Sequence, residues 1–244
     1  MTPAKEFENF LNQAIVMNER KNVRPPSKTY KPSSLGGCIR KVYFEVTGAP
    51  IDTYNEVDPS FVGICESGTD RHERIQNAVM SMKELGMNCE WIDVEEYLKL
   101  YPQEGTVVVQ RVGNEVKLRN TIHNMSFLCD GIIKFGGKYY ILEIKTEFSM
   151  QWQSRKDAAP MHKVQAASYS LCLGIDDVIF VYEQRDFCKK QYYHVPITKL
   201  DRKEKVLDVI ESVESHRENE TVPEKTEITS QCNYCMFKEE CKKW

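Results

Sequence analysis

"SFLCDGIIKFGGKYYILEIKT" occupies residues 126–146 and decides the fold. Two apolar runs rich in β-branched and aromatic residues flank Gly136 and Gly137, and a glycine pair in such a place favours a two-residue hairpin turn. Counting outward from that turn along both strands brings Asp130 opposite Glu143. The stretch therefore predicts an antiparallel pair of strands with two opposed carboxylates near its open end.

These two carboxylates need a cation. Directly opposed residues have Cβ atoms about 4.5–5.5 Å apart, where like charges are destabilising. Carboxylates at that separation suit Mg²⁺ or Mn²⁺. Lys145 shares the face of Glu143, because strand side chains alternate, and an ammonium there can position a metal-bound water and stabilise a phosphoryl oxygen. We therefore expect phosphodiester chemistry. The alternative is a solvated face on which Asp130 merely neighbours Lys145, and the apolar composition of both strands disfavours it.

Helix and strand patterns on both sides of the hairpin indicate a mixed fold. Apolar residues at helical spacing, bounded by Ser, Pro and Gly, predict helices over residues 4–20, 33–48, 59–86, 160–174 and 199–218. Apolar, β-branched runs predict strands over residues 106–112, 116–123, 177–186 and 191–197. We expect one α/β domain of mixed α+β character.

Composition is that of an ordinary globular chain. The 244 residues are 41% hydrophobic and 28% charged, and the net charge of -3 gives no overall attraction to nucleic acid. No stretch has the roughly 20 apolar residues of a membrane span, and the N-terminus lacks the apolar run of a signal peptide. We expect an intracellular, cytoplasmic protein with no membrane partner. No phosphate-binding loop of the P-loop type occurs, so any DNA-unwinding motor would be a partner protein.

Three of the nine cysteines cluster in a polar tail, where burial as small apolar residues does not explain them. Cys232, Cys235 and Cys241 are one thiolate short of the four that a structural zinc ion or an iron-sulfur cluster takes. The tail therefore predicts a metal site with a fourth ligand elsewhere.

The order of the hairpin residues resembles the PD-(D/E)xK nuclease superfamily. Asp130 followed by Glu143-Ile144-Lys145 matches its core, although Cys129 stands where many members have proline. Gln165 and Tyr169 match the Q-x3-Y element of the RecB-like branch, and both project from one face of a helix. His72, in "GTDRHERIQ", resembles the histidine that adds a metal ligand in this branch.

The resemblance implies a restriction-endonuclease-like core, which is a mixed central sheet flanked by helices. It also implies that Mg²⁺ or Mn²⁺ is held by His72, Asp130, Glu143 and the Ile144 carbonyl. Lys145 would position or activate the attacking water, and the Q-x3-Y pair, Gln165 and Tyr169, would help to place the strand. The implied activity is that of a deoxyribonuclease, an exonuclease on single-stranded or end-containing DNA, with roles in recombination or repair and a possible helicase partner.

Cluster-bearing RecB-like nucleases, such as the CRISPR-associated exonucleases and the AddB nuclease domain, have one cysteine before the core and three after it. On this pattern Cys38 joins Cys232, Cys235 and Cys241 as ligands of a 4Fe-4S cluster, with zinc as the alternative metal. The chain then divides into an N-terminal helix and linker (1–32) and a nuclease domain (33–244), whose cluster lobe comprises about 33–48 and 225–244. The alternative functions are a non-catalytic DNA-binding or scaffold protein of the same fold and a zinc-stabilised interaction module.

Overall fold

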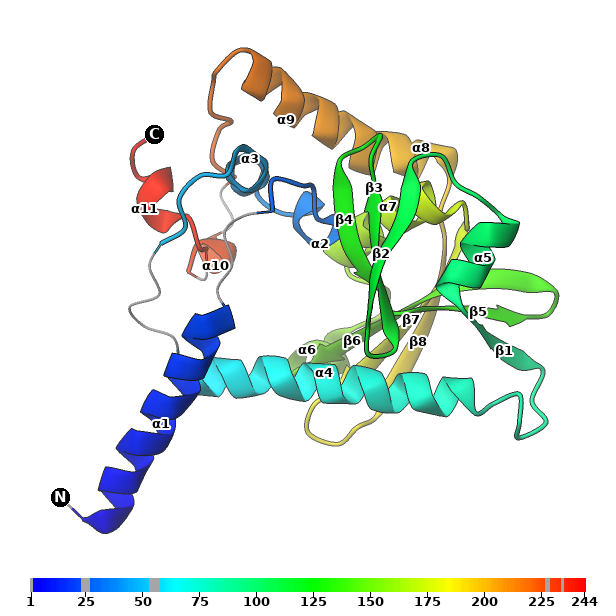
Figure 1. Cartoon of the computed structure of the whole chain (residues 1–244), viewed down its shortest axis with the longest axis horizontal. Helices are drawn as coiled ribbons and strands as arrows, with labels where there is room; N and C mark the ends of the chain where they lie inside the picture. Colours follow the sequence, from blue (N-terminus) through cyan, green and yellow to red (C-terminus); the bar gives the residue numbers. More distant parts are fainter. Residues whose placement is uncertain (1, 23–26, 53–57, 227–228, 234) are drawn as a thin grey trace.

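Two β-sheets form the frame of the protein, and helices lie against them (Figure 1). The structure is a computed structural model, and it describes residues 2–22, 27–52, 58–226, 229–233 and 235–244. Residues 23–26 of the predicted linker and residues 227, 228 and 234 of the predicted cluster lobe therefore lie outside the described residues.

The larger sheet has five strands in the order β1-β5-β6-β7-β8. Its strands are β1 (Cys89–Ile92), β5 (Gly131–Phe135), β6 (Lys138–Glu147), β7 (Asp177–Gln184) and β8 (Lys190–Pro196). The pair β6 and β7 is parallel and the other pairs are antiparallel, so the sheet is mixed. Together with the flanking helices, this confirms the expected restriction-endonuclease-like architecture.

The hairpin of β5 and β6 has the predicted register. Phe135 pairs with Lys138 and Gly131 pairs with Leu142. Gly136 and Gly137 have φ of 56° and 79°, a left-handed conformation at both turn positions that glycine adopts without strain.

The smaller sheet has the order β2-β3-β4 and is antiparallel. Its strands are β2 (Thr106–Val112), β3 (Glu115–Asn120) and β4 (Met125–Cys129). The sequence predicted one strand over residues 126–135, and this was wrong, because the chain leaves one sheet and enters the other at Asp130. Gly131 follows this junction because a Cβ there would lie 2.3 Å from the Trp91 ring.

Two helices dominate the surroundings of the large sheet. The long helix α4 (Pro59–Met80) packs Ile75 and Val79 into one apolar cluster with Ile144 and Val181. Helix α7 (Pro160–Leu173) contributes to a separate and larger cluster, so the sheet has a core on each side. Both helices begin with proline at the first turn, as predicted.

The remaining helices are shorter or lie at the ends of the chain. They are α1 (Pro3–Asn22), α2 (Pro32–Leu35), α3 (Ile39–Thr47), α5 (Val94–Leu100), α6 (Ser149–Ser154), α8 (Lys199–Arg202), α9 (Asp208–Glu218), α10 (Thr229–Cys232) and α11 (Lys238–Cys241). A π-helical turn, Lys203–Leu207, joins α8 to α9. Helix α1 projects away from the sheets (Figure 1). None of the helices among the described residues is both long and apolar enough to cross a bilayer.

The helix predicted over residues 33–48 is two helices. The break falls at Gly36 and Gly37, where a Cβ on Gly36 would lie 2.9 Å from the backbone of Met161 on α7. Close approach of α7 therefore interrupts the pattern, and Cys38 becomes the N-cap residue of α3 instead of lying in a first helical turn. Gly48 ends α3 in the left-handed conformation, as predicted.

Candidate active site

A cleft of about 1220 Å³ lies between α4, the small sheet and the C-terminal half of β6. Its lining includes six residues that the sequence singled out, from four separate parts of the chain: His72, Asp130, Glu143, Lys145, Gln165 and Tyr169. The fold thus brings the predicted catalytic residues to one place.

One histidine and two carboxylates converge at this cleft. His72 Nδ1 lies 3.5 Å from Asp130 Oδ1 and 3.6 Å from Glu115 Oε1. Ligand atoms of the three side chains lie within 4.8 Å of one another, close enough to share a metal ion. Glu115 was not predicted from the sequence. It is the first residue of β3, and the alternation that buries Val116 turns Glu115 toward the cleft.

His72 is protonated in this arrangement. Burial would lower the pKa of the imidazole, but hydrogen bonds and charge from Asp130 and Glu115 outweigh burial and raise the pKa to about 10. A metal ion bound between His72 and these two carboxylates would therefore have to displace a proton.

Asp130 is held from two sides. Its Oδ2 accepts a hydrogen bond of 2.7 Å from the backbone N–H of Ile144, and its carbonyl accepts one of 2.8 Å from Gln76 Nε2. The β4–β5 junction that takes Asp130 out of the strand ladder frees its side chain for these contacts. The Ile144 side chain packs in the core on the α4 side, and the metal-binding role of its carbonyl stays a prediction.

Glu143 is a buried carboxylate whose two oxygens differ in their contacts. Its side chain is 1% exposed, and Oε1 lies 2.5 Å from Lys145 Nζ. Its Oε2 is buried and has no hydrogen-bond partner among the described residues. Burial raises the pKa of Glu143, Lys145 opposes this rise and Asp130 adds to it, and the resulting pKa is about 7.

Lys145 begins a hydrogen-bonded chain that runs away from the acids. Its Nζ donates to Gln165 Oε1 at 3.0 Å, and Gln165 Nε2 donates to the Tyr169 hydroxyl at 2.6 Å. Burial would lower the pKa of Lys145, but Glu143 and Asp130 raise it, so the amine is held as an ammonium. Tyr169 stacks on Phe127 with ring centroids 4.8 Å apart. The Q-x3-Y pair thus fixes the position of Lys145.

A second cavity of about 570 Å³ lies at the other predicted site. Its lining includes Cys38, Cys232, Cys235 and Cys241, so residues far apart in sequence meet there as the ligand prediction requires. Burial would raise the pKa of the Cys38 thiol, but hydrogen bonds from the Lys41, Thr226 and Arg40 backbone N–H groups and the Thr226 side chain outweigh it and lower the pKa. A stabilised thiolate is the form that binds metal.

Direct contacts fasten the C-terminal tail to the segment around α3. Arg40 Nε donates to the Pro223 carbonyl at 2.7 Å, and its Nη1 lies 3.5 Å from Cys241 Sγ. Asp52 accepts from the backbone N–H of Lys238 at 2.7 Å, near the start of α11. Phe237 is fully buried, and its ring lies 5.7 Å from that of Phe44.

The four sulfurs are spread wider than a closed zinc site. Ligands of a tetrahedral zinc thiolate site lie about 3.8 Å apart, because each Zn–S bond is about 2.3 Å. No three cysteine sulfurs among the described residues lie within 4.8 Å of one another.

Comparison with known proteins yields likeness in structure alone. No protein-family model and no curated protein sequence matches the chain. The crystal structure of SSO0001 has 19% sequence identity and a TM-score of 0.51, with 95% of this chain and 94% of that chain covered. LHK-Exo in complex with dAMP has 15% identity and a TM-score of 0.46, with 79% of this chain and 89% of that chain covered.

The alkaline exonuclease LHK-Exo from Laribacter hongkongensis, in another crystal structure, has 11% identity and a TM-score of 0.38, with 80% of this chain and 94% of that chain covered. The likeness to SSO0001 extends over nearly the whole of both chains and concerns the fold.

Proposed function

We propose that the protein is a DNA nuclease that hydrolyses phosphodiester bonds with Mg²⁺ or Mn²⁺. The observation that carries this proposal is the convergence of His72, Glu115 and Asp130 beside a buried Glu143 whose Oε2 has no partner among the described residues. A buried acid oxygen with no partner is costly, and a divalent cation would satisfy it.

The donor set fits a hard divalent cation. Three carboxylates and one imidazole offer oxygen and nitrogen ligands, which suit Mg²⁺ or Mn²⁺. The ligands that would hold the ion are His72, Asp130, Glu143 and the Ile144 carbonyl, and Glu115 joins them. Such an ion, when bound, polarises a phosphoryl oxygen and acidifies a water.

Lys145 serves as a donor and as a positive charge. Because Glu143 and Asp130 raise its pKa, Lys145 is an ammonium in the metal-free protein. It can direct a water and stabilise the growing negative charge on the phosphate. Gln165 keeps it in place by accepting a hydrogen bond from Nζ.

Single-stranded or end-containing DNA is the proposed substrate, in a reducing cytoplasmic compartment. The cleft of about 1220 Å³ is much larger than one metal ion and one phosphate need. Its lining carries the cations Lys31, Lys117, Lys145 and Arg185, which suit a polyanionic strand.

A Lys145→Ala variant tests the enzyme proposal. We expect the wild type to degrade linear single-stranded DNA with Mn²⁺, and the variant to be slower by about 10² to 10³-fold, since a transition-state donor is lost. Lys138→Ala, which removes an exposed lysine at the far end of β6, should act like the wild type. Strands labelled at either end and circular strands distinguish exonuclease from endonuclease action. If neither the wild type nor the variant cuts, the non-catalytic DNA-binding alternative replaces this proposal.

The cysteine cavity is proposed to hold a 4Fe-4S cluster through Cys38, Cys232, Cys235 and Cys241. Support comes from their shared cavity, the lowered pKa of Cys38 and sulfur spacing wider than zinc requires. The role of the cluster is structural, because its ligands join the segment around α3 to the C-terminal tail and shorten a very long loop.

Absorption and metal analysis test the cluster. Protein purified without oxygen should be brown, with broad absorption near 400 nm that is typical of iron-thiolate clusters. Cys235→Ser should lose this absorption, and Cys172→Ser, at a fully buried cysteine outside the cavity, should keep it. A colourless wild type with one equivalent of zinc would favour the zinc-stabilised alternative.

A further inference from the structure

Cations in the active-site cleft differ in how they are paired. Lys145 is bound to Glu143 and Gln165. Lys31, Lys117 and Arg185 line the same cleft, and none of them has an ion pair among the described residues. Lys31 and Lys117 are on flexible stems, whereas Arg185 is fixed.

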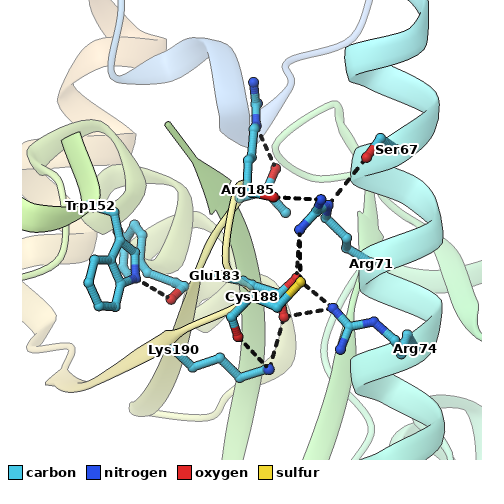
Figure 2. A network of polar contacts seen from close by, with 10 residues as sticks. Ser67, Arg71, Arg74, Trp152, Glu183, Arg185, Cys188 and Lys190 are labelled. Atoms are coloured by element: carbon cyan, nitrogen blue, oxygen red, sulfur yellow. Dashed lines mark hydrogen bonds and ion pairs between the residues drawn. The ribbon is translucent and has the colours of Figure 1, made fainter. Parts of the chain in front are cut away.

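The backbone of Arg185 is held by contacts at both polar groups. Its N–H donates to the Glu147 carbonyl at 2.9 Å, and its carbonyl accepts from Arg71 Nη2 at 2.8 Å (Figure 2). Arg71 in turn is tied to Ser67 and to Glu183. The position of Arg185 at the end of β7 is therefore set by α4 and β6 together.

The side chain of Arg185 is oriented too. Its Nε lies 3.4 Å from Thr146 Oγ1, and its guanidinium carbon lies 4.4 Å from the centroid of the Phe148 ring. Stacking on an aromatic face fixes the plane of a guanidinium and leaves its edge open. Nη1 and Nη2 have no hydrogen-bond partner within the described part of the chain. This pair of terminal nitrogens, the fork of the guanidinium, is therefore available to a ligand.

Glu183, the buried acid nearby, does not pair with the Arg185 guanidinium. Glu183 is fully buried, and it already receives Arg71 at 3.0 Å, Arg74 at 2.6 Å and Lys190 at 2.9 Å. Figure 2 shows these three cations around Glu183 while the Arg185 side chain extends away from them. An oriented guanidinium with a free fork suits the two unesterified oxygens of a phosphate, which it binds bidentately.

Arg185 lines the cleft beyond the acids along β6. Thr146, the partner of Arg185 Nε, lies three residues beyond Glu143, a backbone rise of about 10 Å at about 3.3 Å per residue, and all three residues line the same cleft. We propose that Arg185 binds a backbone phosphate one or two nucleotides away from the phosphodiester at the metal-binding acids. This inference rests on the proposed nuclease function and assigns to it a strand-binding subsite.

Salt-dependent binding tests the subsite. A labelled single strand is titrated in EDTA, where no cleavage occurs, over a series of salt concentrations. Arg185→Gln should weaken binding about five- to tenfold and reduce the slope of log K against log salt by about 0.7, the amount expected for one phosphate contact on a single strand. Lys138→Gln removes one exposed cation outside the cleft and should keep the wild-type slope. An unchanged slope in Arg185→Gln overturns the inference.

Two further variants distinguish charge from orientation. Arg185→Lys should restore the slope and only part of the affinity, because lysine keeps the charge and loses the fork. Phe148→Leu should keep the slope and weaken binding slightly, since it removes only the stacking partner. If Arg185→Lys has the slope of Arg185→Gln, the charge of this residue does not contact phosphate and the inference is wrong.

Substrate size distinguishes a subsite from a general defect. Bis(p-nitrophenyl) phosphate offers one phosphodiester and no neighbouring phosphate. Arg185→Gln should lose more kcat/KM on the DNA strand than on this small diester, and equal losses contradict the subsite. A wild type that cleaves neither substrate and binds no strand defeats the proposed function itself. A wild type that cleaves both while Arg185→Gln keeps its slope defeats only the subsite.

Discussion

Glu143 and Glu183 are two buried glutamates on the neighbouring strands β6 and β7, and their surroundings differ. Their side chains are 1% and 0% exposed. Glu183 receives three cations on its two oxygens, and although burial would raise its pKa, hydrogen bonds and charge from Lys190 and Arg74 lower it (Figure 2). Glu143 receives one cation, keeps a buried oxygen without a partner among the described residues, and has its pKa raised to about 7.

The difference separates an acid whose partners already satisfy it from the acid to which we assign a role in the proposed function. A buried carboxylate with a full set of partners connects α4 to the β7–β8 hairpin and gains little from a ligand. A buried carboxylate that lacks one partner costs stability in the ligand-free protein, and under the proposed function a cation would supply that partner. The four predictions below test this contrast, in order of decreasing effect.

Removing the charge of Glu143 should abolish catalysis with little effect on stability. Glu143→Gln keeps the shape of the side chain and removes a metal-binding oxygen, so we expect cleavage to fall by about 10³-fold. The melting temperature in EDTA should be unchanged or slightly higher, because the variant no longer has a costly buried charge. Comparable losses of activity and melting temperature would place Glu143 with Glu183 as a structural residue.

Removing the charge of Glu183 should lower the stability of the protein and leave most of its cleavage activity. Glu183→Gln leaves Arg71, Arg74 and Lys190 without a counter-ion, which we expect to cost about 2 kcal/mol because Arg74 and Lys190 can still reach solvent. For a chain of this length that corresponds to a melting temperature lower by roughly 4–8 °C. Cleavage well below the melting temperature should keep most of its rate. Glu147→Gln, at another buried acid paired with an arginine, is the matched control.

The two acids should give opposite pH dependences in the metal-free protein. The folded state binds the Glu143 proton more tightly than the unfolded state, so stability falls as pH rises from 4.5 to about 7. Asp130, Lys145 and His72 all face Glu143; Asp130 adds to this rise in the pKa, and Lys145 and His72 oppose it. The lowered pKa of Glu183 contributes stability above pH 4.5 that is lost on acidification.

Melting temperatures in EDTA across this pH range measure both contributions. Glu143→Gln should flatten the curve between pH 4.5 and 7 by a few °C, and Glu183→Gln should flatten it below pH 4.5. In all variants the stability should keep falling above pH 6.5, the ordinary pKa of histidine, because the folded-state pKa of His72 is about 10. Parallel curves for the wild type and Glu143→Gln would contradict the raised pKa of Glu143.

Tyr169 should give the smallest effect. Tyr169→Phe removes the hydroxyl that accepts from Gln165 and keeps the stacking on Phe127. We expect a loss of about threefold to fivefold in kcat, since a neutral hydrogen bond contributes about 1 kcal/mol and acts here only through Gln165 and Lys145. The KM for DNA should stay the same. A large rise in KM would instead indicate that Tyr169 contacts the strand.

The sequence was sufficient for those parts of the site that local patterns determine. Gly136 and Gly137 define a turn whose register follows directly, so the pairing from Phe135–Lys138 to Gly131–Leu142, which ends next to Asp130 and Glu143, could be predicted. The helical spacing of Gln165 and Tyr169 likewise placed both on one face. His72 was identified only through a resemblance, because a single histidine on a long helix has no local pattern that marks it as a ligand.

Other parts of the site depend on contacts between sheets. Glu115 follows an ordinary hairpin turn, and it meets His72 only because the small sheet packs across α4. Asp130 interrupts a run that is uniformly strand-like, so the change of sheet at this residue had no local signal. Strand β1 and helix α5 are short and lie at the sheet edge, and neither has the length that a periodic pattern requires.

Trp91 gives the active site a spectroscopic reporter. Its indole occupies the space that Gly131 leaves free, one residue from Asp130. Indole emission depends on the charge and water around the ring, so replacing the His72 proton by a metal ion changes the field that Trp91 experiences. In a protein whose other two tryptophans, Trp152 and Trp244, are changed to phenylalanine, fluorescence alone would then follow metal entry into the cleft in real time, without any substrate.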